Sequence, residues 1–559
     1  MTTLVLGPLL RYVDETSATL WVEVSDAATV RVAAGDHVAT ARTFAAHDHH
    51  YALVELSGLG PGTRTPYAVS IDGETVWPEP DSDFPAPVIP TLEPGKPLRM
   101  AFGSCRVSVP HDEDGTKAFG VDALRSYALH MAGSSGERWP DLVLFLGDQV
   151  YADETSEEMQ DFIAARRDID EPPGEELKDF EEYSYLYRIA WSDPANRWLL
   201  STLPSAMIFD DHDIRDDWNT SWTWRQEMAE KSWWHDRIVG GLSSYWVYQH
   251  LGNLSPAVRA ADPMWQQITT WEGERELDIS SELDALAEKA DQEPDCYRWS
   301  FARDFDDQVR LVVLDSRAAR VLQPDSRSIL DRSEMAWFDG QLRGDVDHVL
   351  IGTSLPYLLA PGLHQAEAFS EGLCQGAWGP RFAKVGERLR QSIDLEHWGA
   401  FQQGFREVAD MVLYLASGGR GRAPHTITFL SGDVHHSYVA TARADPAVTD
   451  LRVTSAVVQA VCSPIRNPLP LVMQRITKFG ARRRPARVMQ WLARSAKVSA
   501  SPLTWELDRG PWHDNNLAVL EVRPDGRLRL RWLAGDIEGR PTDAPTLRTV
   551  AEVDVPLRP

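Results

Sequence analysis

The sequence is poor in cysteine and has no long apolar run. Its 559 residues include only four cysteines, which are widely scattered: Cys105, Cys296, Cys374 and Cys462. This spacing does not suggest a disulfide framework, so we expect a reducing compartment. No stretch approaches the roughly 20 apolar residues that a membrane-spanning helix needs. The first residues also lack the basic start and apolar centre of a secretory signal, and we therefore expect a cytoplasmic protein.

Positive charge is scarce as well. The chain has 56 lysine and arginine residues against 83 acidic ones, which gives a formal net charge of -27. Such an excess of negative charge argues against a general nucleic-acid binder. The length allows two or more domains. We see no internal repeat and no sign of an obligate protein partner.

The first part of the chain has the pattern of a β-protein. Short alternating apolar runs occur at residues 18–24, 29–33, 51–56 and 65–71, with turn residues between them. Regular spacing of this kind predicts a small β-sandwich of the immunoglobulin or fibronectin III type over residues 1–96. Its end, residues 77–97, is rich in proline and is interpreted as a linker.

Residues 97–559 have the pattern of an α/β domain. Apolar runs typical of strands buried on both faces of a sheet occur at residues 98–102, 142–146, 205–209, 308–314, 348–354 and 426–430. A hairpin is predicted over residues 516–532, around Pro524-Asp525-Gly526. Two helical inserts are predicted, at about residues 222–292 and 466–500.

Polar residues of the metal-binding kind follow four of these strands. They are Cys105, then Asp148 with Tyr151, then an acidic cluster at 210–217 that includes His212, and then Asp433 with His435. Strands of one sheet would bring these residues to the same edge. Together they can hold two or more cations, and an aspartate shared by two metals about 4 Å apart suits in-line attack on phosphorus. A phenolate and a thiolate on one ion favour ferric iron.

Four ordered motifs carry a family resemblance. They are Gly103-Ser104-Cys105, Gly147-Asp148-x-x-Tyr151, Asp210-Asp211-His212-Asp213 and Ser431-Gly432-Asp433-x-His435, and the chain resembles the alkaline phosphatase D-like metallophosphoesterases in them. The strand end Leu314-Asp315-Ser316-Arg317 is also similar. The resemblance implies a four-layer αββα metallophosphoesterase core and a phosphomonoesterase or phosphodiesterase that uses a metal-activated water. It also implies Fe³⁺ with Ca²⁺, or other divalent cations, as cofactors.

The resemblance also implies roles for individual residues. Cys105, Asp148 and Tyr151 would hold iron with Asp433 beside them, while Asp148 would bridge to calcium with His435 and Asp216. Asp213 belongs to the implied metal set, and substrate oxygens would be contacted by His212, Arg106 or Arg215. The third motif departs from the family pattern, because Asp213 stands for a glutamate and Asp216 and Asp217 for an asparagine pair. The added negative charge would alter which divalent ion binds.

One segment reverses the charge pattern. Residues 452–497 contain ten basic residues and no acidic one. Two parts of it, 471–476 and 488–492, can form amphipathic helices with basic flanks. Such helices could dock on an anionic membrane or polymer, or form a basic hairpin that covers the protein's own acidic surface. The first reading defines an alternative function, a non-catalytic membrane-surface or scaffold protein.

Overall fold

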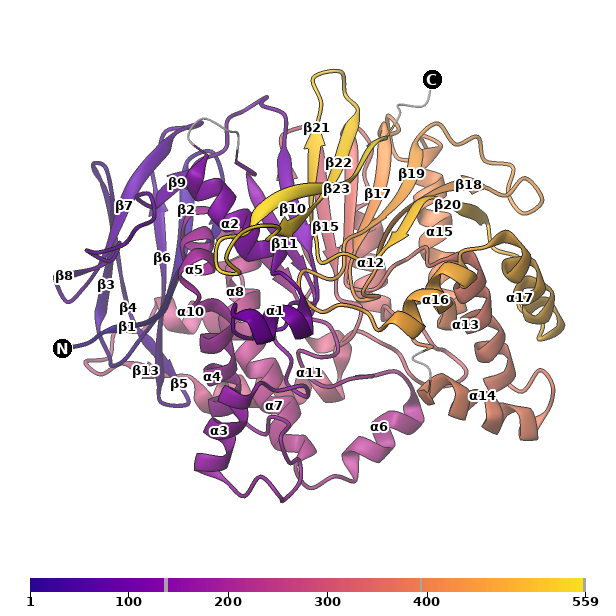
Figure 1. The fold of residues 1–559 in the computed structure, drawn as a ribbon, viewed down its shortest axis with the longest axis horizontal. Coiled ribbons are helices and arrows are strands. Elements are labelled where there is room, and N and C mark those ends of the chain that lie inside the picture. The colour runs from indigo at the N-terminus through magenta and orange to yellow at the C-terminus, as the bar shows by residue number, and fades with distance from the viewer. Residues whose placement is uncertain (135–138, 393–394, 556–559) are drawn as a thin grey trace.

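The computed structural model describes residues 1–134, 139–392 and 395–555 and shows a mixed α/β fold (Figure 1). Two smaller sheets are formed mainly by the N-terminal residues. Two larger sheets form the centre of the molecule, with helices around them. No helix in the described ranges has both the length and the apolar character that crossing a bilayer requires.

The N-terminal residues form two sheets that share one hydrophobic core. One has the order β1 (Leu4–Val13), β2 (Ser17–Val24), β6 (His49–Ser57), β5 (Phe44–Ala46) and β13 (Leu277–Asp278). The other has the order β4 (His37–Arg42), β3 (Thr29–Ala34), β7 (Arg64–Ile71) and β8 (Glu74–Trp77), and β9 (Val88–Pro90) pairs with β7. Val22 and Val54 of the first sheet pack in the same core as Val32 and Val69 of the second. The four predicted runs are therefore all strands.

Two expectations for this region need comment. The proline-rich segment 77–97 is a strand in part, since Val88–Pro90 pairs with Arg64–Pro66; proline is tolerated there because β9 is an edge strand. The N-terminal sheets are also joined to the rest of the chain. The buried Arg11 donates to the carbonyl oxygens of Tyr248 at 3.0 Å and Gln249 at 2.6 Å. Core residues on both sides of residue 96 pack in one cluster, and the predicted domain division stays a prediction.

The two larger sheets pack face to face. The six-stranded sheet has the order β12 (Ser205–Ile208), β11 (Leu142–Leu146), β10 (Arg99–Gly103), β21 (Leu517–Val522), β22 (Leu528–Asp536) and β23 (Thr546–Val555). The seven-stranded sheet has the order β14 (Phe301–Phe305), β15 (Val309–Leu314), β16 (His348–Thr353), β17 (Thr426–Ser431), β19 (Ala456–Val461), β18 (Ser437–Ala444) and β20 (Leu503–Trp512). Gly352 of β16 lies against the side chains of Leu144 and Leu146 of β11, so a methyl group there would lie 3.2 Å from Leu146. Close contact between the sheets explains why the whole Leu142–Leu146 run is buried.

Helices cover the outer faces of both sheets. Helices α12 (Arg332–Gln341) and α15 (Gln402–Ala416) share a core with Val312, Ile351 and Phe429 of the seven-stranded sheet. Helix α2 (Ala123–Gly133) packs against β22 and β23 of the six-stranded sheet. The layers thus follow the order helix, sheet, sheet, helix.

The remaining helices form two groups. One group includes most of the predicted insert at 222–292: α3 (Glu157–Arg166), α4 (Phe180–Trp191), α6 (Trp222–Ala229), α7 (Trp234–Tyr245), the π-helix η1 (Trp246–His250), α8 (Leu251–Asn253), α9 (Pro256–Arg259), α10 (Pro263–Thr269) and α11 (Ser280–Gln292). Of these, α3, α6 and α7 lie at the bottom of Figure 1. Those on the right are α13 (Pro361–Cys374), α14 (Pro380–Ser392), α16 (Leu471–Gly480) and α17 (Arg483–Ser495). Short helices elsewhere are α1 (Glu113–Phe119), α5 (Pro194–Thr202), η2 (Pro294–Cys296) and η3 (Trp398–Ala400).

Candidate metal centre

The predicted strand ends converge where the two large sheets meet. Cys105, Asp148 and Asp210 follow the neighbouring parallel strands β10, β11 and β12, whereas Asp433 follows β17 of the other sheet. The backbone N–H of Asp433 donates to Ser104 Oγ at 3.1 Å. At Gly432 a Cβ atom would lie only 2.0 Å from the same oxygen. Glycine at this position therefore lets the ends of the two sheets come together.

Four of the predicted ligands have strained backbones. Cys105, Asp148, Asp433 and His435 have φ angles of 57°, 50°, 65° and 49°. The left-handed conformation costs a residue other than glycine roughly 1–3 kcal/mol. Strain of this kind persists only where the surrounding structure enforces it, and it clusters at functional sites. The strained backbone at these four residues therefore lowers stability while it fixes the direction of their side chains.

The thiol, a carboxylate, an imidazole and the phenol form one group, in which His435 is partly buried and the others are buried. Cys105 Sγ donates to Asp148 Oδ2 at 3.3 Å, and the ligand atoms of Cys105, Asp148 and His435 lie within 4.8 Å of one another. Tyr151 packs against Cys105, and its hydroxyl oxygen accepts a hydrogen bond from Asn467 Nδ2 at 3.1 Å. Burial lowers the pKa of His435 to about 4, which leaves the imidazole neutral and able to bind a metal.

Asp148 also belongs to a second group, with Asp210 and Asp211, whose ligand atoms again lie within 4.8 Å of one another. The buried atoms Asp148 Oδ1 and Asp210 Oδ2 accept no hydrogen bond from the part of the chain that the structure describes. Burial raises the pKa of both carboxyl groups well above the ordinary value. A cation between them would supply the missing partner and reverse this shift, so the residues fit a bound metal.

Two further groups share Asp211. One joins it to His212 and Asp216, and the other joins it to Glu396 and Asp433. His212 Nδ1 lies 2.9 Å from Asp153 Oδ1, and its Nε2 lies 3.9 Å from Asp216 Oδ1. The Asp216 side chain is 62% exposed, so the cluster reaches solvent at this point.

Arg317 places a permanent positive charge among these carboxylates. Its fully buried guanidinium donates to Asp210 and, at 2.5 Å, to Glu396 Oε2. One of its nitrogens, Nη2, lies 3.1 Å from Asp211 Oδ1 and 3.8 Å from Asp433 Oδ1. The strand end that carries Arg317 was recognised in the sequence, but no role was predicted for this residue. Its position three residues after the end of β15, and two after Asp315, was the available signal.

His397 is a second residue that the sequence did not reveal. His397 Nε2 lies 2.9 Å from Asp433 Oδ2, and its Nδ1 lies 2.7 Å from Glu367 Oε1 of α13. Burial alone would raise the pKa of Asp433, but His397 and Arg317 hold it below the ordinary value. His397 and Glu396 do not follow a predicted strand, which explains why strand-end reasoning missed them. Asp210 and Asp211 did follow one, and the predicted ligand set should have included them.

Asp213, which was predicted as a metal ligand, binds backbone N–H groups in this structure. Asp213 Oδ2 accepts the backbone N–H groups of Asp148 at 2.9 Å and Asp210 at 2.8 Å. Its Oδ1 accepts hydrogen bonds from Val150 N–H and Gln249 Nε2, both at 3.4 Å. Both oxygens are thus occupied in tying the end of β11 to the end of β12, and Asp213 belongs to none of the ligand groups.

The two predicted substrate-binding arginines are engaged elsewhere. Arg106 Nε donates to Asp122 Oδ2 at 2.9 Å, and its Nη1 donates to the carbonyl oxygen of Ala190 at 2.8 Å. Arg215 Nε donates to Glu176 Oε2 at 3.0 Å. Both guanidinium groups are paired outside the cluster here, and their contact with substrate stays a prediction, whereas His212 lies within the cluster.

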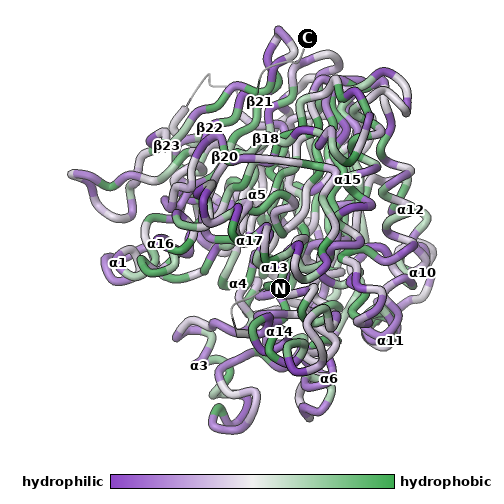
Figure 2. The backbone as a smooth tube through the Cα atoms, turned by 90° about the vertical axis from the view of Figure 1, so that its right-hand side faces the viewer, coloured by the Kyte–Doolittle hydropathy of each residue, from purple (hydrophilic) through white to green (hydrophobic). Residues whose placement is uncertain are grey.

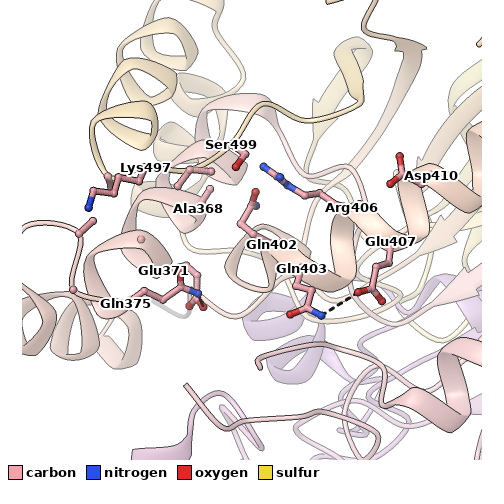
Figure 3. Close-up of a pocket in the computed structure, with 15 residues that line it drawn as sticks. Ala368, Glu371, Gln375, Gln402, Gln403, Arg406, Glu407, Asp410, Lys497 and Ser499 are labelled. Atoms are coloured by element: carbon pink, nitrogen blue, oxygen red, sulfur yellow. Dashed lines mark hydrogen bonds between the residues drawn. The ribbon is translucent and has the colours of Figure 1, made fainter. Parts of the chain in front are cut away.

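A separate pocket lies between α13, α15 and the residues after α17 (Figure 3). Its volume is about 550 Å³, and its polar lining includes Gln402, Arg406 and Lys497. Gln403 Nε2 donates to Glu407 Oε1 at 3.0 Å on its wall. None of the candidate ligands lines it, so this pocket is distinct from the metal centre.

Two solved structures are similar to this chain. A solved structure of PhoD is similar over 99% of this chain and 90% of PhoD, with a TM-score of 0.59 and 14% identity. At that identity the likeness shows the fold. A purple acid phosphatase, PPD1 from yellow lupin (Lupinus luteus) seeds, covers 98% of this chain and 73% of its own, with a TM-score of 0.47 and 10% identity. That second likeness is too weak to argue from.

Family models give a clearer result than single proteins. A search of curated protein sequences gave no significant match. Residues 1–89 match a domain of unknown function, DUF7800. Residues 125–489 match the model of the PhoD-like phosphatases, and they include most of the residues assembled at the metal centre. Because this match covers more than half of the chain, the protein belongs to the PhoD-like phosphatase family.

Proposed function

We propose that the protein is a metal-dependent phosphoric ester hydrolase that acts on phosphomonoesters or phosphodiesters and uses Fe³⁺ and Ca²⁺. The observation that carries the proposal is the position of Asp148, which is shared by two adjacent ligand groups and has one buried oxygen without a hydrogen bond. A carboxylate in this position can bridge two cations. Membership of the PhoD-like phosphatases supports the reaction class.

The residues divide into two sets by chemistry. Cys105, Asp148 and Tyr151 would hold the ferric ion, because a thiolate and a phenolate favour a trivalent metal. Asp148 would bridge to calcium, together with the carboxylates of Asp210 and Asp211, whose hard oxygens suit that ion. When bound, such cations lower the pKa of water and neutralise charge on phosphate oxygens.

His212 is proposed to hold the proton for the leaving group. Burial alone would lower the pKa of His212, but Asp153 and Asp211 raise it well above the ordinary value. Asp153 accepts from Nδ1, so the ring is fixed with Nε2 on the side of Asp216 and solvent. An imidazolium in this position can bind a phosphate oxygen and donate a proton to the departing alkoxide or phenolate.

The finer description of the fold is part of the same proposal. The helix–sheet–sheet–helix order supports an αββα core of the metallophosphoesterase type. The shared core of the two N-terminal sheets supports a β-sandwich of the immunoglobulin or fibronectin III type.

The test combines metal analysis with turnover. Purified protein loaded with iron and calcium should hydrolyse an aryl phosphate monoester or a bis-aryl phosphodiester. Asp148→Ala should lose bound metal and turnover together, whereas Asp81→Ala, at an exposed carboxylate in the 77–97 segment, should keep both. Absence of hydrolysis by the loaded protein would refute the activity. Unchanged metal content in Asp148→Ala would refute the bridging role of Asp148.

A further inference from the structure

Three surface helices, α14, α16 and α17, expose an unusual amount of apolar side chain. Of nineteen large hydrophobic residues that are exposed in the described ranges, eleven lie on or next to these helices: Trp378, Phe382, Val385, Leu389, Leu471, Val472, Met473, Ile476, Phe479, Val488 and Trp491. All three helices pack against α13 on the right-hand side of Figure 1. Concentrated exposed apolar surface of this kind marks an interaction site.

The large apolar side chains of these helices are exposed. In α16 Val472, Ile476 and Phe479 follow a spacing of four and three residues and therefore share one face. Thr477 and Gly480 of the same helix, which are small, are buried. In α17 Val488 and Trp491 are exposed. The apolar stripes thus point away from the protein, which is the reverse of an ordinary surface helix. Figure 2, viewed from this side, shows apolar and polar residues alternating along α16 and α17.

Basic side chains surround the apolar stripes. Arg475 and Lys478 of α16 and Arg484, Arg487 and Arg494 of α17 are exposed, and none forms an ion pair with a carboxylate of the described residues. The predicted hairpin therefore does not use these cations to cover the protein's own acidic surface. A chain with a net charge of -27 presents a locally cationic face here.

We propose that α14, α16 and α17 dock the protein on an anionic phospholipid bilayer. The cations match the lipid phosphates, and the apolar stripes, which include Trp378 and Trp491, match the boundary between headgroups and acyl chains. A symmetric contact with a second copy would instead bring the two cationic faces together. The bilayer is therefore the occupant that satisfies both the charge and the apolar surface.

A short stretch of chain joins the docking surface to the candidate metal centre. Asn467, which hydrogen-bonds Tyr151, lies four residues before the start of α16. Docking would hold the centre close to the bilayer. This inference goes beyond the proposed hydrolase and does not depend on it, because binding to vesicles can be measured without turnover.

The test is co-sedimentation of the full chain with vesicles. The protein should bind vesicles of equal parts phosphatidylcholine and phosphatidylglycerol, should not bind phosphatidylcholine alone, and should dissociate as salt is raised. Val488→Ser/Trp491→Ser should weaken binding at least about tenfold, because both side chains lose their place in the lipid interface. Arg484→Ser/Arg487→Ser should weaken it about 30-fold and reduce its salt dependence.

The matched control is Val258→Ser/Trp271→Ser. Val258 is 56% exposed, against 57% for Val488, and Trp271 is also exposed, but both lie in the helical insert. This control should bind vesicles like the unmodified protein. The proposal is overturned if the protein stays unbound with phosphatidylglycerol at low salt, or if the control loses as much binding as the helix variants. It is also overturned if sedimentation velocity shows a dimer that Val488→Ser/Trp491→Ser abolishes while vesicle binding is absent.

Discussion

Replacing Arg317 by methionine should destabilise the protein strongly, and calcium should relieve part of the loss. The guanidinium is fully buried and lies between Asp210, Asp211, Glu396 and Asp433. Methionine fills much of the same volume but removes the counter-charge of Asp210 and Asp211, whereas Asp433 keeps His397 and Glu396 keeps Arg320. Removing one partner of a buried ion pair costs about 3–5 kcal/mol. We therefore expect the free energy of unfolding in chelator to fall by about that amount.

The measurement is urea unfolding followed by circular dichroism, with chelator and with saturating calcium. Calcium should reduce the difference in free energy of unfolding between Arg317→Met and the unmodified protein, because a bound cation restores positive charge to the cluster. The control is Arg529→Met, at an exposed pair with Asp554, where little loss is expected because solvent screens the two charges. A loss for Arg317→Met as small as that of the control would refute the reasoning. A difference in free energy of unfolding that calcium leaves unchanged would also refute it.

Three other substitutions test separate parts of the structure. Asp213→Ala should lower the free energy of unfolding by about 1–3 kcal/mol, because buried N–H groups lose their acceptor. Unlike Asp148→Ala, the folded fraction of this variant should keep its metal content. Loss of metal would show that Asp213 is a metal ligand. Cys105→Ser should lower the iron content by elemental analysis while calcium is retained; parallel loss of both ions would contradict the separate iron group. His49→Gln should lose stability at about pH 6 but not at about pH 10, by up to about 2–3 kcal/mol in urea unfolding. Burial alone would lower the pKa of His49, but Glu181 and Glu23 raise it to about 9. The stability that His49 contributes is therefore complete below the ordinary pKa of histidine and is lost as the pH rises through about 9. An equal loss at both pH values would contradict this ion pair.

Much of the centre could be predicted because it depends on strand ends. The unbroken run Leu142–Leu146 predicted a buried strand, and parallel neighbours bring whatever follows them to one edge. That argument holds for Cys105, Asp148 and Asp210, which follow neighbouring strands of one sheet. Asp433 was expected in the same sheet but follows β17 of the other one, and it joins them because the two sheets meet there. Strand-end reasoning could not find Arg317 or His397, whose importance comes from charge and hydrogen bonds made across the fold.

The direction of a side chain is harder to predict than its position. Asp213 lies three residues from Asp210, yet loop geometry turns its oxygens toward backbone N–H groups. Arg106 is adjacent to Cys105 and points the other way, toward Asp122. The 466–500 insert was predicted to be helical, but the sequence cannot show which face of a helix meets solvent. That face is decided by packing against α13, which lies about a hundred residues earlier in the chain.

The joining of the two large sheets has a consequence for how the centre is made. Cys105 Sγ lies 3.5 Å from the carbonyl oxygen of Asp433, although the two residues are 328 positions apart in sequence. Closing a loop of that length has a large entropic cost, and distant contacts of this kind form late in folding. A chain still missing β17 would have only part of the ligand set. Metal binding is therefore expected to follow folding, after β17 has brought the last ligands to the centre.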